Sequence, residues 1–169
     1  MSEEEKQRYL IVDSTAIIHH FILESKLKED EFLVIPEMLV KELKSFESKS
    51  ILTLIETEGK LIEASPSSES LEKIKEISKK TGDFAALSKV DIQVLALALE
   101  FPNSIIYSDD NAIQNVSAFM NIEVISQHFK IKSKREYYWK CGVCGTKFST
   151  KVEACVECGS PVKRYFIRK

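Results

Sequence analysis

Four cysteines near the C-terminus have the spacing of a metal site. They form two C-x-x-C-G motifs, one with Cys141 and Cys144 and one with Cys155 and Cys158. Each motif makes a tight turn that places two thiolates on one side, and its glycine accepts the backbone conformation that this turn requires. Two such turns complete a closed tetrahedral site, so the pattern predicts one structural zinc ion without a catalytic role. Iron is the alternative metal, whereas redox chemistry would need only one cysteine pair.

Carboxylates in the first part of the chain could hold a different metal. Several carboxylates that converge on one cleft repel one another unless a cation neutralises them. Mg²⁺ and Mn²⁺ prefer oxygen ligands, and such ions activate water and stabilise charge in phosphodiester cleavage. Each aspartate has an ordinary alternative role at a helix N-terminus, so spacing alone indicates only a candidate metal site. The candidates are Asp13, Glu42, Asp91, Asp109 and Asp110.

The elements that must position these carboxylates alternate between strands and helices. Alternation of this kind predicts a parallel sheet covered by helices. Ligands of such sheets bind at the carboxyl ends of the strands, where Asp13 and the pair Asp109–Asp110 must lie. Ser88 and Asp91 fit the S-x-x-D pattern that caps a helix. We predict strands over residues 9–12, 32–35, 61–64, 104–107 and 122–125, and helices over 14–24, 37–45, 51–58, 71–80, 90–100 and 109–120, with a loop at 65–70.

The charge of the chain is distributed unevenly. Residues 1–131 hold 14 of the 24 basic and 23 of the 26 acidic residues, a net charge of −9. Residues 132–169 hold the remaining 10 basic and 3 acidic residues, a net charge of +7. A zinc ion held by four thiolates would lower the second value to about +5. The basic part is therefore expected to contact a polyanion.

We predict three segments along the chain. Residues 1–126 form an α/β domain, residues 127–139 a basic and aromatic linker, and residues 140–169 a zinc ribbon. The three consecutive aromatic residues 137–139 could stack on bases, or they could pack the ribbon against the first domain. The basic residues expected to contact nucleic-acid phosphates are Lys132, Lys134, Arg135 and Lys140.

Four segments of the first domain resemble the PIN-domain family in the order that the family has. They are LIVDSTAII (10–18), VIPEMLVKEL (34–43), LSKVDIQVLALALE (87–100) and IIYSDDNAIQNVSAF (105–119). With the C-terminal cysteine motifs, the chain is similar to the archaeal Nob-type endonucleases of ribosome assembly. The family's acidic positions fall on the five carboxylates named above, and we expect Asp109 to be the principal ligand of its pair, with Asp110 as a nearby acidic partner.

The resemblance implies a three-layer α/β/α domain with a parallel sheet. It implies an endoribonuclease that uses one or two Mn²⁺ or Mg²⁺ ions, held by Asp13, Asp91 and Asp109, to activate water. The implied substrate is single-stranded precursor rRNA, cut at the 3′ end of the small-subunit rRNA. The implied partners are the small ribosomal subunit and its assembly factors.

Composition limits the other readings. No apolar run approaches the roughly 18–20 residues that a membrane span needs, and the acidic N-terminus does not have the pattern of a secretory signal. Paired cysteines used for metal suit a reducing cytoplasm.

Two functions are alternatives to the ribosome-assembly endonuclease: a non-cleaving RNA-binding module of ribosome assembly and a toxin-type PIN ribonuclease. The presence of all expected acids disfavours the first, and the ribbon disfavours the second.

Overall fold

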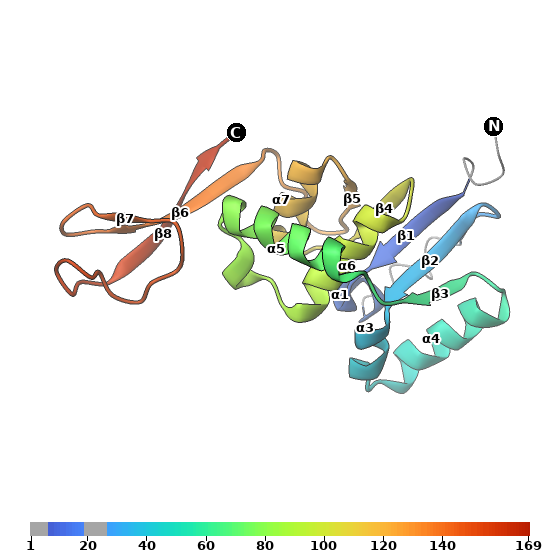
Figure 1. The fold of residues 1–169 in the computed structure, drawn as a ribbon. Coiled ribbons are helices and arrows are strands. Elements are labelled where there is room, and N and C mark those ends of the chain that lie inside the picture. The colour runs from blue at the N-terminus through green and yellow to red at the C-terminus, as the bar shows by residue number, and fades with distance from the viewer. Residues whose placement is uncertain (1–6, 19–26) are drawn as a thin grey trace.

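A five-stranded parallel sheet is the centre of the first domain in the computed structural model, which describes residues 7–18 and 27–169 (Figure 1). Its strand order is β3-β2-β1-β4-β5, and every neighbouring pair is parallel. The five strands occur where the sequence predicts them. They are β1 (Arg8–Val12), β2 (Glu31–Pro36), β3 (Leu61–Ala64), β4 (Ser104–Tyr107) and β5 (Glu123–Ile125).

Successive strands are added first on one side of β1 and then on the other. The chain moves outward from β1 to β3 and then returns to β4, on the other side of β1. Right-handed crossovers in opposite directions place their helices on opposite faces, which gives the predicted three-layer α/β/α fold. The first set is α1 (Ser14–Ile18), α3 (Glu37–Glu42) and α4 (Phe46–Thr57), and the second is α5 (Ser68–Thr81), the 3-10 helix η2 (Phe84–Ala86), α6 (Lys89–Glu100) and α7 (Asn111–Met120).

The central strands and α6 supply most of the core. Ile11 of β1 and Ile106 of β4 are fully buried, as are Leu95 and Leu97 of α6. Strands of a parallel sheet are covered on both faces, which explains why β1 and β4 are continuous apolar runs rather than alternating ones. The rigid centre of the domain therefore lies directly beneath the ends of β1 and β4.

Several helix boundaries differ from the sequence prediction. Helix α5 begins at Ser68, inside the predicted loop 65–70, because the Ser67 side chain accepts a hydrogen bond from the Ser70 amide at 3.2 Å. Helix α4 begins at Phe46 rather than at residue 51, since Ser45 caps it in the same way. Helix α3 ends at Glu42 rather than at residue 45. The part of the predicted helix 14–24 that follows residue 18 lies outside the described residues.

The second sheet is a three-stranded antiparallel ribbon. Its order is β7-β6-β8, with β6 (Arg135–Cys141) in the middle, flanked by β7 (Lys147–Phe148) and β8 (Val162–Arg168). Strand β6 begins at Arg135, within the segment expected to be a linker. Figure 1 shows the ribbon extending past α5 and α7, at the end of the molecule opposite β3 and α4.

A polar network joins the ribbon to the first domain. The Arg164 guanidinium donates to the Gly82 carbonyl at 3.0 Å and to the buried Asp83 carboxylate at 2.8 Å. Asn115 donates to the other Asp83 oxygen at 2.6 Å and exchanges two hydrogen bonds of 2.7 Å with the backbone of Arg135. Burial raises the pKa of Asp83, although the hydrogen bonds from its neighbours and the Arg164 charge oppose this.

Gly82 allows the two parts to approach closely. Its φ of 76° lies in the left-handed region, where glycine has no steric penalty. A Cβ atom at this position would collide with the Tyr137 backbone of β6. The junction therefore requires glycine both for its conformation and for its lack of a side chain.

Within the residues that the structure describes, no helix has the length and apolar character needed to cross a membrane.

Candidate functional site

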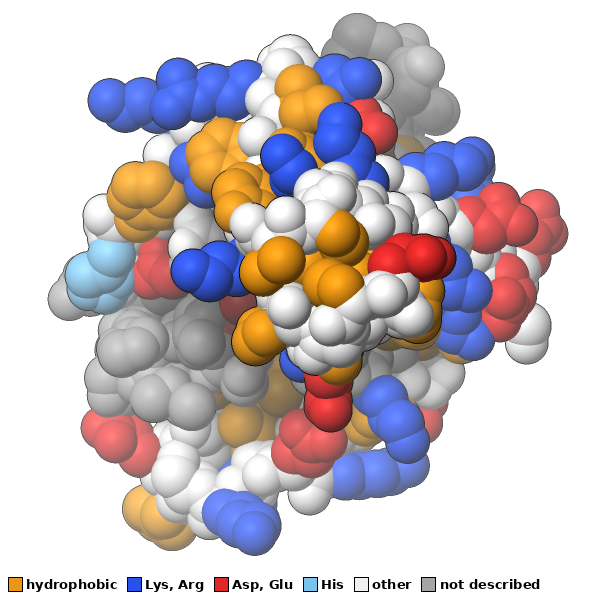
Figure 2. Space-filling view, turned by 90° about the vertical axis from the view of Figure 1, so that its left-hand side faces the viewer, with side chains coloured by type: hydrophobic (Ala, Val, Ile, Leu, Met, Phe, Trp, Pro, Cys, Tyr) orange, Lys and Arg blue, Asp and Glu red, His pale blue; other side chains and the backbone are white. Residues whose placement is uncertain are grey.

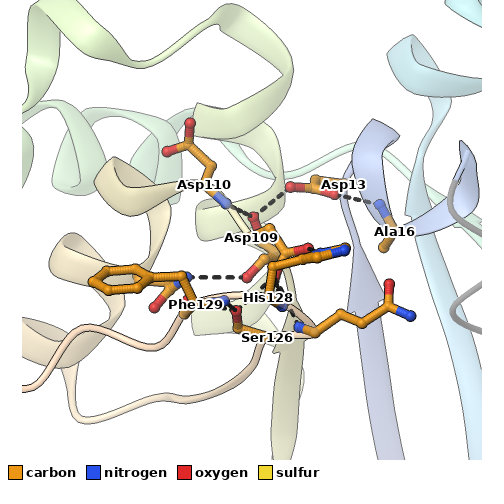
Figure 3. Close-up of polar contacts among 10 residues, drawn as sticks. Asp13, Ala16, Asp109, Asp110, Ser126, His128 and Phe129 are labelled. Atoms are coloured by element: carbon orange, nitrogen blue, oxygen red, sulfur yellow. Dashed lines mark hydrogen bonds and ion pairs between the residues drawn. The ribbon is translucent and has the colours of Figure 1, made fainter.

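Asp13 is held rigidly at the carboxyl end of β1. Its side chain is 2% exposed, and its Oδ1 accepts a hydrogen bond of 2.8 Å from the Ala16 amide in the first turn of α1. The Ser108 hydroxyl, which follows β4, donates to Oδ2 (Figure 3). Because strand order reverses between β1 and β4, this carboxylate lies at the switch point where ligands of open α/β sheets bind.

Ser108 also links Asp13 to Asp110. The Asp110 amide donates to the Ser108 hydroxyl oxygen at 3.0 Å. The Asp110 side chain caps α7, because its Oδ1 accepts from the amides of Ala112 and Ile113 at 2.7 and 3.0 Å. Both of these hydrogen bonds use the same oxygen of Asp110. The carboxyl ends of β1 and β4 are thus connected through one serine, which the sequence interpretation did not select although it directly precedes the aspartate pair.

Asp109 has a different environment from its neighbour. Its Oδ1 accepts hydrogen bonds from the Ser126 hydroxyl at 2.6 Å and from the amides of Gln127 and His128 at 2.8 and 3.0 Å. Its Oδ2 lies 2.7 Å from Nδ1 of His128. In Figure 3 the Asp109 carboxylate faces His128 and Ser126, whereas that of Asp110 points away from them. Both oxygens of Asp109 therefore hold the segment that follows β5.

The electrostatics of Asp109 agree with this anchoring role. Partial burial favours the neutral acid, but hydrogen bonds from Ser126, His128 and the backbone outweigh it and hold the pKa of Asp109 below its ordinary range. Gln114 of α7 supports the same segment, since its amide nitrogen donates to the Phe129 carbonyl at 2.7 Å and its oxygen accepts from the Ile131 amide at 2.9 Å.

The capping pattern predicted at Asp91 is confirmed. The Ser88 hydroxyl accepts from the Asp91 amide at 3.1 Å, and Oδ2 of Asp91 accepts from the Ser88 amide at 2.7 Å. The capping bond thus employs one carboxylate oxygen of Asp91. Glu42, the last residue of α3, has an exposed side chain.

The five carboxylates do not form one tight cluster. In residues 7–18 and 27–169, the four cysteines are the only group of three or more metal-binding side chains whose ligand atoms lie within 4.8 Å of one another. Asp13, Asp109 and Asp110 share the edge formed by β1 and β4, while Asp91 and Glu42 come from other elements. This arrangement suits a hard cation that keeps several waters and takes few protein carboxylates, as Mg²⁺ does.

The cysteines form the predicted metal site. Sγ of Cys141 lies 3.5 Å from that of Cys158, and Sγ of Cys144 lies 3.5 Å from that of Cys155. Zinc–sulfur bonds of about 2.3 Å in a tetrahedron separate the sulfurs by roughly 3.8 Å, so these four thiols fit such an ion. All four cysteines are free of disulfides. The site therefore has the geometry of a zinc ribbon.

Polar contacts and glycines shape the two cysteine turns. Hydrogen bonds from Thr146 lower the pKa of Cys144 to about 6, whereas burial raises the pKa of Cys155. Gly145 and Gly159 have φ values of 77° and 70°, as expected for glycines that follow such turns. Their amides donate to the carbonyls of the first cysteine in each motif, at 3.2 and 2.8 Å.

The basic residues expected to bind nucleic acid are only partly free. The ammonium group of Lys134 lies 5.6 Å from the centre of the Phe119 ring, and the guanidinium of Arg135 lies 5.0 Å from that of Phe166. Lys132 is exposed and Lys140 is half-buried. Trp139 is buried, so of the two roles considered for the aromatic residues, packing is the one that its structure supports.

Comparison with known proteins shows the family. The family described as "PIN domain of ribonuclease" matches residues 10–101. "Endoribonuclease Nob1" of Methanocaldococcus jannaschii is 39% identical over 163 residues, covering 94% of this chain and 78% of that protein. The protein of the same name in Pyrococcus abyssi is 35% identical, over 74% of this chain and 78% of its own length. "Ribonuclease VapC1" of Thermoplasma acidophilum is 31% identical, over 94% and 79%. The chain therefore belongs to the PIN-domain ribonuclease family, and its four C-terminal cysteines form a zinc ribbon that follows the PIN domain.

Proposed function

We propose that this protein is a divalent-metal-dependent endoribonuclease. Its substrate would be single-stranded precursor rRNA, cleaved at the 3′ end of the small-subunit rRNA during ribosome biogenesis. The family match and the Nob1 relatives support the reaction class. The observation that carries the proposal is the buried Asp13 at the strand-order switch point, joined through Ser108 to the helix cap formed by Asp110.

The donor set fits Mg²⁺ or Mn²⁺. Carboxylate oxygens are the ligands that these ions prefer, and the aspartates gathered at this edge repel one another unless a cation lies between them. When bound, one or two such ions would activate water and stabilise charge on the phosphodiester. The residues proposed to contribute to this site are Asp13, Glu42, Asp91, Asp109 and Asp110.

The hydrogen bonds distinguish the roles of the two neighbouring aspartates. Asp110 and Asp91 each use one oxygen for capping, so the second oxygen of each is available to a cation. Both oxygens of Asp109 are employed by residues 126–128. Three of these donors share Oδ1 of Asp109, which is more than the two lone pairs of one carboxylate oxygen accommodate well. Asp13 also has both oxygens hydrogen-bonded, but its donors, the Ala16 amide and the Ser108 hydroxyl, directly follow β1 and β4 and keep its carboxylate at the switch point. We therefore assign direct metal contact to Asp13, Asp91 and Asp110, and assign Asp109 to positioning, in place of the principal-ligand role expected from the sequence.

The proposed function also includes roles for the C-terminal part and a location in the cell. We assign a nuclease domain to residues 1–126 and a zinc-binding ribbon to the C-terminal part. The ribbon begins at Arg135, the start of β6, so the linker expected over 127–139 is shortened to 127–134. Lys132, Lys134, Arg135 and Lys140 would contact RNA phosphates. Free cysteines paired for metal support a cytoplasmic location, where the small ribosomal subunit and its assembly factors would be the partners.

An RNA that spans the 3′ end of small-subunit rRNA tests the proposal. Incubation of the zinc-loaded chain with this RNA and Mn²⁺ should give discrete internal cuts, mapped by primer extension. No cleavage should occur without Mn²⁺ or Mg²⁺. Tight binding without any cut would favour the non-cleaving assembly module, and equal cutting of unrelated RNAs would contradict the proposed rRNA substrate.

A further inference from the structure

A groove lies between the ribbon and the first domain, and its lining does not include Lys132, Lys134, Arg135 or Lys140. One cavity of about 490 Å³ separates the end of α5 and η2 from β6 and the residues after β7. A second cavity, of about 360 Å³, shares Trp139 and Lys151 with the first and continues to Arg164 of β8. The two cavities are therefore adjacent along the junction, and together they are called the junction groove. The first alone has the size of a small-ligand site.

The side chains of the groove have the chemistry of a nucleotide site. Lys79 and Lys80 of α5 and Lys151, which follows β7, line the first cavity, and all three are exposed. Phe84, which is 38% exposed, and Trp139, which is 6% exposed, line the same cavity. Lysines beside aromatic rings are the combination that binds the phosphates and bases of single-stranded nucleic acid.

The charge of the groove is not cancelled by its lining. No acidic residue lines either cavity in the described part of the chain. The neighbouring Asp83 is 1% exposed and is paired with Arg164. A polyanion is therefore the complementary occupant. In Figure 2, which views the ribbon end of the molecule, Lys and Arg side chains lie on several sides of the ribbon.

The groove lining is close in sequence to one carboxylate of the candidate active site. Its wall η2 ends at Ala86, and α6, whose first turn carries Asp91, begins at Lys89. The groove lining therefore ends a few positions before Asp91 in the sequence. The position of the groove depends on the close approach of β6 to Gly82, which the absence of a Cβ atom permits.

We propose that this junction groove binds nucleotides of single-stranded RNA adjacent to the cleaved segment. Phosphates would contact Lys79, Lys80 and Lys151, and a base would lie against the exposed Phe84, close enough to the buried Trp139 to alter its surroundings. The inference rests on the proposed function, because it assumes an RNA substrate. It differs from the expected linker contacts because none of its lysines belongs to residues 132–140.

The single tryptophan of the chain makes the groove directly observable. We would titrate the zinc-loaded full chain with a 12-nucleotide oligouridylate, without Mn²⁺ or Mg²⁺, while following Trp139 emission and the anisotropy of labelled RNA. Emission should change over the same concentration range as anisotropy. The double variant K80A/K151A should weaken binding about tenfold and reduce the slope of log affinity against log salt by about 1.4, since each lost phosphate contact removes about 0.7.

A matched variant controls for the loss of two charges. Lys49 of α4 and Lys73 of α5 are exposed and do not line the groove, so K49A/K73A should bind RNA within about twofold of the unmodified chain. Unchanged Trp139 emission together with equal affinity of the two double variants would overturn the groove. So would an absence of RNA binding. Groove binding without Mn²⁺-dependent cleavage would support this inference while contradicting the proposed nuclease activity.

Discussion

At the residue scale, the two neighbouring aspartates after β4 illustrate what a motif leaves undecided. Side chains of consecutive residues point in different directions, and here Asp109 faces residues 126–128 while Asp110 caps α7. The motif did not decide which member of the pair is the principal ligand, and the sequence interpretation favoured Asp109. The contacts that distinguish the two aspartates come from a segment 17 to 19 positions later. The partner residues Ser126 and His128 gave no local signal.

The distinction predicts opposite effects of two conservative substitutions. Asp110→Asn should abolish cleavage with little change in stability, because asparagine still accepts the capping hydrogen bonds but binds a hard cation poorly. Asp109→Asn should retain substantial cleavage but lower the free energy of unfolding by about 1–3 kcal/mol at pH 7, through loss of charge-assisted hydrogen bonds. Mn²⁺-dependent cleavage rates and denaturant unfolding of both variants measure this. Equal loss of cleavage in the two variants would contradict the assignment.

The lowered pKa of Asp109 adds a pH dependence to the stability difference. A carboxyl group with a folded-state pKa below its ordinary value of 3.8 stabilises the fold above that value, and this contribution disappears as the pH falls through the lowered pKa. The difference in melting temperature between the unmodified chain and Asp109→Asn should therefore narrow as the pH is lowered below 3.8. A constant difference would show that Asp109 acts through packing alone.

At the scale of elements, apolar patterns predicted the strands better than the helix starts. The run 104–107 matched β4 because buried parallel strands are continuous apolar segments. Helix α5 began earlier than expected because the capping Ser67 lies in a Ser- and Pro-containing segment with loop composition. Strand β6 was taken as linker because its main partner, β8, follows 21 residues after it ends. Pairing over such a distance leaves no local pattern.

Two glycines at helix ends provide a matched test of the junction. Gly59 and Gly82 follow α4 and α5 with φ values of 69° and 76°, but only Gly82 has atoms within 4 Å of an added Cβ, namely those of Tyr137. Alanine at either position should cost about 1 kcal/mol for the left-handed conformation. Gly82→Ala should lose roughly 1–3 kcal/mol more through overpacking and shift Trp139 emission to longer wavelength. Identical unfolding curves for the two variants would contradict the close packing.

The zinc ribbon should depend on its metal while the first domain does not. Cys155→Ser removes one of four ligands, so the variant should release zinc and lose the β6–β8 hairpin tip, because metal binding supplies much of the folding energy of such a small module. The five-stranded domain should still melt cooperatively, since its core contains none of the cysteines. Circular dichroism with zinc analysis measures both properties. A single transition of the whole chain, lost on chelation, would contradict this independence.

At the scale of the whole molecule, charge separates the acidic first domain from the basic C-terminal part. Residues 132–169 carry a net charge of +7 against −9 for the remainder, which suits an RNA-contacting part beside a cation-binding one. Replacing Lys132, Lys134 and Arg135 by glutamine should weaken RNA binding. If all three contact phosphates, the slope of log affinity against log salt should fall by about 2. An unchanged slope would assign these residues to packing, as the ring contacts of Lys134 and Arg135 already do in part.

The central claim is that Asp13 organises a metal-dependent nuclease site at the switch point of the sheet. Its most direct test is the single-turnover cleavage rate of an RNA spanning the 3′ end of small-subunit rRNA, measured with Mn²⁺ for the unmodified chain and Asp13→Asn. We predict discrete products from the unmodified chain and a loss of at least about 100-fold in the variant, with RNA binding and melting temperature retained. Undiminished cleavage by a folded Asp13→Asn protein, or no cleavage by the unmodified chain, would contradict the account.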